Sequence, residues 1–276
     1  MKSDTVSLFY FRIYIANIVM SSLVRLIDRF VFKTLAAALA LTLSSSLWAA
    51  DLTVSAAASL TQAFQEIGAQ FEAQHPGTKV KFNFGASGAL VQQIIHGAPV
   101  DVFASADTDT MDKAVAKAVI SAKDIQTFTS NRLVLITPVQ AELVLKQLSD
   151  LKKSEVKRFA MGVPASVPAG HYAQGALDKA GLWHDLIHKV ISTQNVRQAL
   201  DYVARAEVDA GFVYASDAQL MADKVKVALV VPTATPIQYP VAKVSASKQT
   251  DTAQAFIAFV QSSNGQATLK KFGFGK

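Results

Sequence analysis

The chain has 276 residues, of which 51% are hydrophobic and 17% charged, and this balance excludes an intrinsically disordered protein. It contains no cysteine, which excludes disulfide bonds, thiolate metal sites and a cysteine nucleophile. The net charge of +6 falls to +3 when residues 1–49, with five basic and two acidic residues, are set aside, so we expect no nucleic-acid partner.

The predicted elements begin with a secretory signal peptide. Three basic residues precede an apolar run at residues 35–43, and small residues lead from there to Ala49. A membrane anchor is the alternative, but the apolar stretch is too short to cross about 30 Å of hydrocarbon as a helix. We therefore expect residues 1–49 to be the signal peptide and the mature protein to lie in the periplasm. Translation from Met20 would leave a signal of ordinary length, so Met20 is a candidate start.

Segments typical of strands and helices alternate after residue 50. Apolar runs and alternating patterns predict strands at residues 52–56, 80–84 and 100–104. Apolar residues at helical spacing predict helices at residues 60–71 and 90–95. Strands separated by helix-length segments are typical of right-handed βαβ units and a mainly parallel sheet.

A second series of elements follows residue 131. We expect strands at 133–137, 159–163, 211–214 and 239–244, helices that begin at Pro168 and Asn195, and C-terminal helices at 252–261 and 265–271. No linker rich in Gly, Ser or Pro separates the two series. This pattern predicts an α/β fold of two Rossmann-like lobes with mainly parallel sheets, joined by hinge strands that cross between the lobes at 132–137 and 239–244. Residues 50–131 and 240–276 would form lobe 1, and residues 132–239 would form lobe 2.

Several predicted helices begin at residues suited to binding an anion. Ser59 follows a strand and has Gln62 at capping-box spacing, Ser87 precedes another helix, and Asn195 has the spacing of an N-cap. Helix N-termini at the carboxyl ends of strands offer unpaired N–H groups and the positive end of the helix dipole. The alternative for each of these residues is an ordinary cap, which stabilises its helix by about 1 kcal/mol.

Six motifs spread over residues 51–276 are distinctive in combination. They are Ala56-Ala-Ala-Ser-Leu60, Gly97-Ala-Pro-Val-Asp-Val-Phe-Ala-Ser-Ala-Asp107, Val167-Pro-Ala-Gly170, Asn195-Val-Arg-Gln-Ala-Leu200, Gly211-Phe-Val-Tyr-Ala-Ser-Asp217 and Lys271-Phe-Gly-Phe274. In this order they resemble the periplasmic molybdate-binding proteins, which are type II solute-binding proteins of ABC transporters. One departure is the segment Gly85-Ala-Ser-Gly88, because several relatives have a run of serines there.

The resemblance implies a function and a set of ligand-binding residues. It implies a monomer that captures molybdate or tungstate in the periplasm and delivers it to the permease of an ABC importer. Molybdenum would be present only within the bound oxyanion, and no cofactor is expected. The oxyanion would be bound by the hydroxyl groups of Ser59, Ser87 and Tyr214 and by the backbone N–H groups of Ala169 and Val196.

Two other functions stay open on the sequence alone. Ser59 lies between a strand and a helix, as a hydrolase nucleophile would, but the Gly-x-Ser-x-Gly motif is absent and no motif places a histidine beside it, so we predict no enzyme. The second alternative is a binding protein for sulfate or another small oxyanion, or for an organic acid. An amino-acid binder would need an arginine that faces the ligand, and we expect Arg197 to point away from the cleft or to pair nearby.

Overall fold

The computed structural model describes Met20 and residues 50–275. The predicted signal peptide, apart from Met20, therefore lies outside the described residues. The chain divides after Trp48, and the fold described below is that of Ala49–Lys276. Among the described residues, no helix has both the length and the apolar character needed to span a membrane.

The first of two five-stranded sheets has the strand order β2-β1-β3-β10-β4. In it β1 (Ala50–Ala57) pairs in parallel with β2 (Thr78–Gly85) and β3 (Val102–Ala104), and β10 (Ile237–Lys243) lies antiparallel between β3 and β4 (Gln126–Asn131). Four strands thus run in one direction, and β10 runs in the other.

Helices cover both faces of this sheet. The helices α2 (Thr61–Gln74), α9 (Thr250–Gln261) and α10 (Ser263–Lys271) pack together on one face, and α3 (Ser87–Ile95) and α4 (Thr108–Ala116) cover the other. Alternation along the strands explains this arrangement, because successive side chains point to opposite faces. In β3, Val102 and Ala104 belong to the core under α2 and α9, and Phe103 belongs to the core under α3 and α4.

The second sheet repeats this plan with the order β7-β6-β8-β5-β9. In it β6 (Phe159–Gly162) pairs in parallel with β7 (Val190–Thr193) and β8 (Ala210–Tyr214), and β5 (Leu133–Pro138) lies antiparallel between β8 and β9 (Val225–Val231). The helices that accompany it are α5 (Pro168–Lys179), α6 (Trp183–Leu186), α7 (Val196–Ala204) and α8 (Ala215–Leu220). Short 3-10 helices occur at Ala58–Leu60, Ala122–Asp124, Leu148–Lys152 and Ile187–Lys189.

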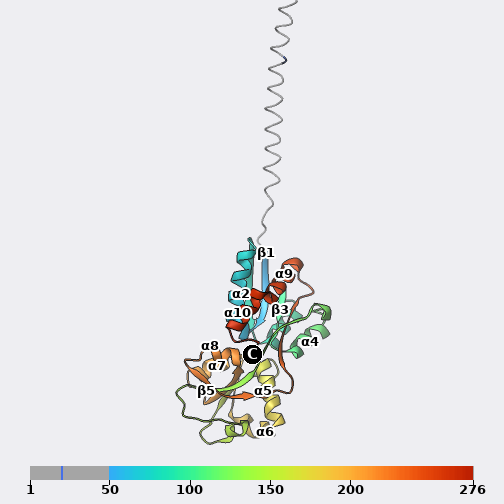
Figure 1. The fold of residues 1–276 in the computed structure, drawn as a ribbon. Coiled ribbons are helices and arrows are strands. Elements are labelled where there is room, and N and C mark those ends of the chain that lie inside the picture. The colour runs from blue at the N-terminus through green and yellow to red at the C-terminus, as the bar shows by residue number, and fades with distance from the viewer. Residues whose placement is uncertain (1–19, 21–49, 276) are drawn as a thin grey trace, which may run out of the picture. The chain divides into compact units, whose positions relative to one another are not determined.

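Figure 1 shows the two sheets as separate layers, with α2, α9, α10 and α4 around the first and α5, α6, α7 and α8 around the second. We call the first sheet with its helices the first lobe, which comprises residues 50–131 and 237–275, and the second sheet with its helices the second lobe, which comprises residues 133–231. The predicted α/β fold is confirmed. The sheets are mixed, because each contains one strand that runs against the other four.

The predicted hinge strands are wrong in one respect. Neither β5 nor β10 is shared between the sheets, because Leu133 pairs with Tyr214 and Val231 of the second sheet, whereas Ile237 pairs with Asn131 of the first. The chain crosses at residue 132 and again within residues 232–236. Residues 237–239, which the sequence placed in the second lobe, therefore belong to the first sheet.

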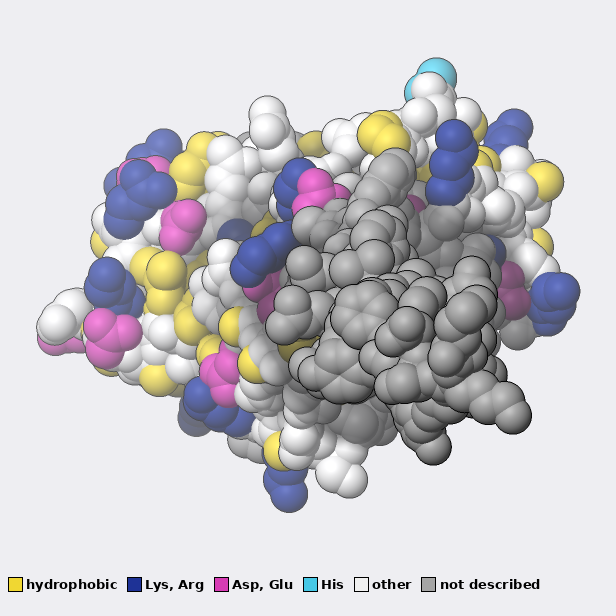
Figure 2. All heavy atoms as spheres, turned by 90° about the horizontal axis from the view of Figure 1, so that it is seen from above, with side chains coloured by type: hydrophobic (Ala, Val, Ile, Leu, Met, Phe, Trp, Pro, Cys, Tyr) yellow, Lys and Arg dark blue, Asp and Glu magenta, His cyan; other side chains and the backbone are white. Residues whose placement is uncertain are grey.

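The charged surface consists of side chains of both signs. On the described part of the face in Figure 2, Lys and Arg side chains lie beside Asp and Glu side chains. Two ion pairs in the first lobe have this character: Lys79 with Glu72 at 2.8 Å and Lys271 with Glu66 at 2.6 Å. Such exposed pairs contribute only about 0–1 kcal/mol each, so the fold depends on its apolar cores.

Candidate functional site

A small cavity lies between the two lobes, at the carboxyl ends of strands from both sheets. Its lining residues are Ala57, Ala58, Ser59, Gly85, Ala86, Ser87, Ala106, Val167, Pro168, Ala169, Asn195, Val196 and Tyr214. Its volume of about 10 Å³ is far below the roughly 300–1,000 Å³ of pockets for drug-sized ligands. Hollows of about 530 and 580 Å³ exist elsewhere, but each is lined by residues of the first lobe alone. The cavity between the lobes therefore has no room for a ligand of that size.

All the residues that the resemblance assigned to the oxyanion lie around this cavity. The first lobe contributes Ser59 and Ser87, and the second lobe contributes Ala169, Val196 and Tyr214. The lining contains backbone, hydroxyl, amide and apolar groups and, among the described residues, no charged side chain. The structure thus brings together residues that are up to 155 positions apart in the chain, which span Ser59 to Tyr214.

Ser59 is held by a buried tyrosine and not by its own helix. It lies in the 3-10 helix that precedes α2, and the N-cap of α2 is Leu60 without a side-chain cap, so the predicted capping box is wrong. Its Oγ lies 3.0 Å from the hydroxyl oxygen of Tyr239, to which Asn131 Nδ2 donates at 3.4 Å. Burial raises the pKa of Tyr239 well above its ordinary value, so the phenol keeps its proton. That proton can be donated to Ser59, which leaves the Ser59 proton for a ligand.

Ser87 has a similar arrangement. It is the first residue of α3, whose N-cap is Ala86, and its side chain caps no N–H group of the helix. Its Oγ instead accepts the backbone N–H of Ala106 at 3.0 Å. Because this oxygen already accepts a hydrogen bond, the hydroxyl proton of Ser87 is available to an anion in the cavity.

Tyr214 ends β8 and reaches the cavity from the second lobe. Its side chain is buried, and burial raises its pKa well above the ordinary value, so it acts as a neutral donor. Its hydroxyl donates to the carbonyl oxygen of Ala106 at 3.4 Å, a long bond that crosses between the lobes. An anion in the cavity would offer this hydroxyl a stronger acceptor, since hydrogen bonds to charged groups are shorter and stronger.

The two backbone donors stand at helix N-termini, as the sequence indicated. Pro168 opens α5, and Ala169 is the next residue. Val196 opens α7, and the Asn195 side chain accepts the Gln198 N–H at 3.0 Å, which confirms the predicted N-cap. N–H groups in the first turn of a helix have no partner within the helix. Two helix N-termini of the second lobe thus meet the two serines of the first.

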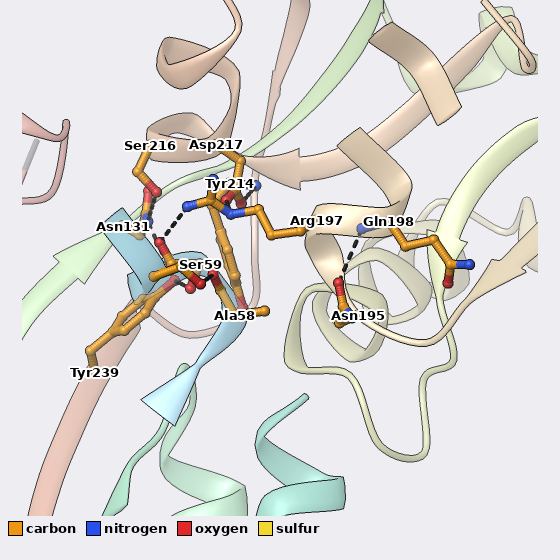
Figure 3. Close-up of polar contacts among 11 residues, drawn as sticks. Ala58, Ser59, Asn131, Asn195, Arg197, Gln198, Tyr214, Ser216, Asp217 and Tyr239 are labelled. Atoms are coloured by element: carbon orange, nitrogen blue, oxygen red, sulfur yellow. Dashed lines mark hydrogen bonds and ion pairs between the residues drawn. The ribbon is translucent and has the colours of Figure 1, made fainter. Parts of the chain in front are cut away.

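Arg197 pairs nearby, as expected, and it does not line the cavity. Its Nε lies 2.8 Å from Oδ1 of the buried Asp217, close enough for an ion pair although not aligned as a hydrogen bond, and its Nη2 donates to the Ser59 carbonyl at 2.7 Å. Asp217 Oδ2 accepts the backbone N–H of Tyr214 at 3.1 Å. Burial raises the pKa of Asp217, and the positive charge of Arg197 opposes that rise. Figure 3 shows Arg197 between Asp217 and Ser59.

Sequence reasoning missed three residues that support the site, which are Asn131, Tyr239 and Asp217. Pairing of β4 with β10 brings Asn131 and Tyr239 together next to Ser59. No local sequence pattern predicts such a contact between distant segments. Asp217 stands three residues after Tyr214, at the start of α8, and this spacing could have indicated that its carboxylate accepts the Tyr214 N–H.

The sequence profile of the bacterial extracellular solute-binding proteins matches residues 52–275. The chain belongs to this family. This solute-binding protein is 38% identical over 229 residues to the molybdate-binding protein ModA of Escherichia coli K12, which covers 81% of the chain and 88% of that protein. Members of the family are transport components, so the prediction of no enzyme is confirmed.

Two solved structures share the fold of the solute-binding protein. The periplasmic molybdate-binding protein of Azotobacter vinelandii superimposes with a TM-score of 0.71 at 24% identity, over 81% of this chain and 98% of that one. The sulfate-binding protein SubI of Mycobacterium tuberculosis H37Rv superimposes with a TM-score of 0.73 at 17% identity, over 82% and 86% of the two chains. At these identities they establish the fold alone, which is the type II periplasmic binding-protein fold that the sequence predicted.

Proposed function

We propose that this protein captures molybdate or tungstate in the periplasm and delivers it, as a monomer, to the permease of an ABC importer. The observation that carries the proposal is the convergence of hydroxyl and helix N-terminal donors from both lobes on one small cavity. The likeness to the molybdate-binding protein of Escherichia coli supports the choice of ion. No cofactor is needed, because binding alone performs the function.

Neutral donors can offset much of the cost of binding a dianion in this cavity. Removing an ion from water costs on the order of 20 kcal/mol by idealised Born estimates unless it is compensated. Hydrogen bonds to a charged group contribute about 1.5–3 kcal/mol each, and helix N-termini add favourable dipoles. We assign these donors to Ser59, Ser87, Ala169, Val196 and Tyr214. Because the donors have fixed positions, the size of a tetrahedral ion decides how well it fits.

Sulfate is the second candidate ligand, since the same fold serves a sulfate-binding protein. Both ions are tetrahedral dianions, so the same donors could bind either, and cavity size would have to separate them. The 38% identity to a molybdate-binding protein against 17% to a sulfate-binding protein favours molybdate. Tungstate is close to molybdate in size, and the cavity should not distinguish the two.

Calorimetry with purified protein lacking residues 1–49 tests the proposed ligand. Molybdate and tungstate should bind with similar affinity, and sulfate and phosphate should bind much more weakly. Sulfate binding as tight as molybdate binding would replace the proposal with the sulfate alternative.

Export is the second part of the proposal. The pattern of basic flank, short apolar run and small residues before Ala50 supports cleavage after Ala49, and the family is extracellular. Mass spectrometry of periplasmic protein should find a mature N-terminus at Ala50 or within a residue or two. Full-length protein retained in the membrane fraction would contradict export by a cleaved signal.

A further inference from the structure

Arg197 makes a charged contact between the lobes that the proposed ligand set does not use. It lies in the first turn of α7 in the second lobe, and its Nη2 donates to the backbone carbonyl of Ser59 in the first lobe at 2.7 Å. Its side chain is 19% exposed, so this hydrogen bond is largely shielded from water. Figure 3 shows the side chain extending from α7 to the segment that carries Ser59.

Asp217 orients Arg197 from within the second lobe. Its side chain is fully buried, and its two oxygens are used differently: Oδ2 accepts the Tyr214 N–H, and Oδ1 lies 2.8 Å from Arg197 Nε. Asp217 and Arg197 both belong to the second lobe, so their pairing does not require the lobes to be closed. The hydrogen bond to the Ser59 carbonyl does require closure, because its acceptor belongs to the first lobe.

We propose that Arg197 is a positioning residue whose hydrogen bond to the Ser59 carbonyl holds the two lobes together when the protein closes on its ion. We call this contact the clasp. This inference rests on the proposed function. Arg197 contacts the backbone of Ser59 and is adjacent in sequence to Val196, and both of these are proposed to bind the ion. Its partner Asp217 also accepts the N–H of Tyr214, a third proposed ion-binding residue. The clasp therefore fixes donors of both lobes relative to one another without touching the ion. Since it forms only on closure, it slows opening and release of the ion.

Other contacts between the lobes are weaker or uncharged. His171 Nε2 lies 3.4 Å from Asp109 Oδ2, but both side chains are more than half exposed, and exposed pairs contribute little. The Gly88 N–H donates to the Ser166 carbonyl at 3.0 Å, a bond between neutral groups. The contact of Arg197 combines a full charge with burial, which makes it the stronger clasp.

The rate of ion release tests the clasp. Wild-type protein loaded with radiolabelled molybdate is chased with unlabelled molybdate, and the variants Arg197→Gln and Arg197→Lys are compared with it. We expect release from Arg197→Gln to be about tenfold faster, the equivalent of one charged hydrogen bond, with an association rate near that of wild type. Arg197→Lys should fall between the two, because an ammonium group cannot reproduce the fork of a guanidinium that spans two partners.

Two further variants control for the loss of an arginine elsewhere and for the effect of an unpaired Asp217 on folding. Arg205→Gln removes an arginine that follows the same helix and makes only an exposed pair with Glu207 at 3.4 Å, so its release rate should equal that of wild type. Arg197→Gln leaves the carboxylate of Asp217 buried and unpaired, which endangers folding. The double variant Arg197→Gln with Asp217→Asn removes both charges, keeps an acceptor for the Tyr214 N–H, and should also release the ion faster.

The possible results are distinguishable. An unchanged release rate in the double variant, or a slower association with unchanged release, would overturn the clasp while leaving the proposed function intact. A wild-type protein that binds sulfate and not molybdate would overturn the proposed ligand, and the same chase with labelled sulfate would then decide the clasp. A wild-type protein that binds neither ion would overturn both.

Discussion

Ser59 and Ser87 carry hydroxyl groups whose role depends on the rest of the fold. Their positions at helix starts allowed either a cap or a ligand, and the sequence could not decide between these. In the structure neither side chain caps its helix, and each oxygen already accepts or can accept a hydrogen bond from elsewhere. A hydroxyl whose oxygen accepts a hydrogen bond has its proton free to donate, and both serines line the same cavity. The local sequence thus places a hydroxyl, and distant residues decide where its proton points.

Removal of either hydroxyl should weaken binding without unfolding the protein. Ser59→Ala and Ser87→Ala each delete one charged hydrogen bond to the ion, so we expect molybdate affinity measured by calorimetry to fall by about 1.5–3 kcal/mol. Ser262→Ala is the matched control, because its Oγ accepts the Gly265 N–H at the start of α10, far from the proposed site in the chain. It should lose about 1 kcal/mol of unfolding free energy and bind normally. Normal binding by both site variants would remove the serines from the ligand set.

Asp107 should make the folding stability of the protein depend on pH. It is the N-cap of α4, and burial raises the pKa of its carboxyl above the ordinary 3.8, although bonds from Thr110 and Ser105 oppose the rise. The folded protein therefore binds this proton more tightly than the unfolded chain does. Stability falls as the pH rises from the pKa of Asp107 in the unfolded chain through its higher pKa in the folded protein. Asp107→Asn keeps the cap and cannot ionise.

The expected result for Asp107→Asn follows from this loss of wild-type stability with rising pH. At neutral pH its unfolding free energy should equal or exceed that of wild type, and the difference should shrink as the pH falls toward 3.8. Urea denaturation at several pH values measures it. A variant that is less stable than wild type at neutral pH, by a margin that shrinks in acid, would mean that the charge of Asp107 is stabilising.

At the scale of elements, the strands that the sequence missed share one property. β4, β7 and β9 are all edge strands of their sheets, whereas the central strands β1, β3, β10, β6, β8 and β5 were found. A central strand is buried on both faces and has a continuous apolar run, but an edge strand is partly solvated. β4 has the sequence QTFTSN, in which Phe128 is the one large apolar residue. The edge strand β2 was found because its residues alternate clearly between a half-buried and an exposed face.

The junction of α3 with the loop before α5 offers a test of closure by backbone geometry. The Gly88 N–H donates to the Ser166 carbonyl at 3.0 Å, and a Cβ atom on Gly88 would lie 2.7 Å from that oxygen. Gly88→Ala should therefore oppose close approach of the lobes while each lobe keeps its own core. We expect molybdate binding to weaken by about 1–3 kcal/mol, the usual cost of overpacking.

Gly175→Ala is the control for this variant. It introduces the same methyl group within α5, where no atom lies within 4 Å of the new Cβ. Its unfolding free energy should rise by up to about 1 kcal/mol because alanine favours helix, and its affinity should not change. If Gly88→Ala binds as tightly as Gly175→Ala, the contact at Ser166 has no part in closure.

At the scale of the whole molecule, the ion should act as the bridge between the lobes. The proposed donors are divided between the two lobes, so the ion has a higher affinity for the closed state and shifts the population toward it. Solution scattering should record a smaller radius of gyration when molybdate is added. Tyr214→Phe removes one donor of the second lobe and keeps the ring, so we expect weaker binding and less compaction at sub-saturating molybdate. Wild-type protein that does not compact at saturating molybdate would contradict closure.

The position of β10 has a consequence for how the chain is made. β10 lies between β3 and β4, so β4 has no partner strand until residues 237–243 have been synthesised, after the whole of the second lobe. The second lobe is one continuous stretch, and its sheet contains no strand from the residues that follow it. Folding during synthesis usually proceeds from the N-terminal domain. Here the first lobe cannot complete its sheet until the chain has been made through residue 243, so completion of the N-terminal sheet has to wait for a strand near the C-terminus.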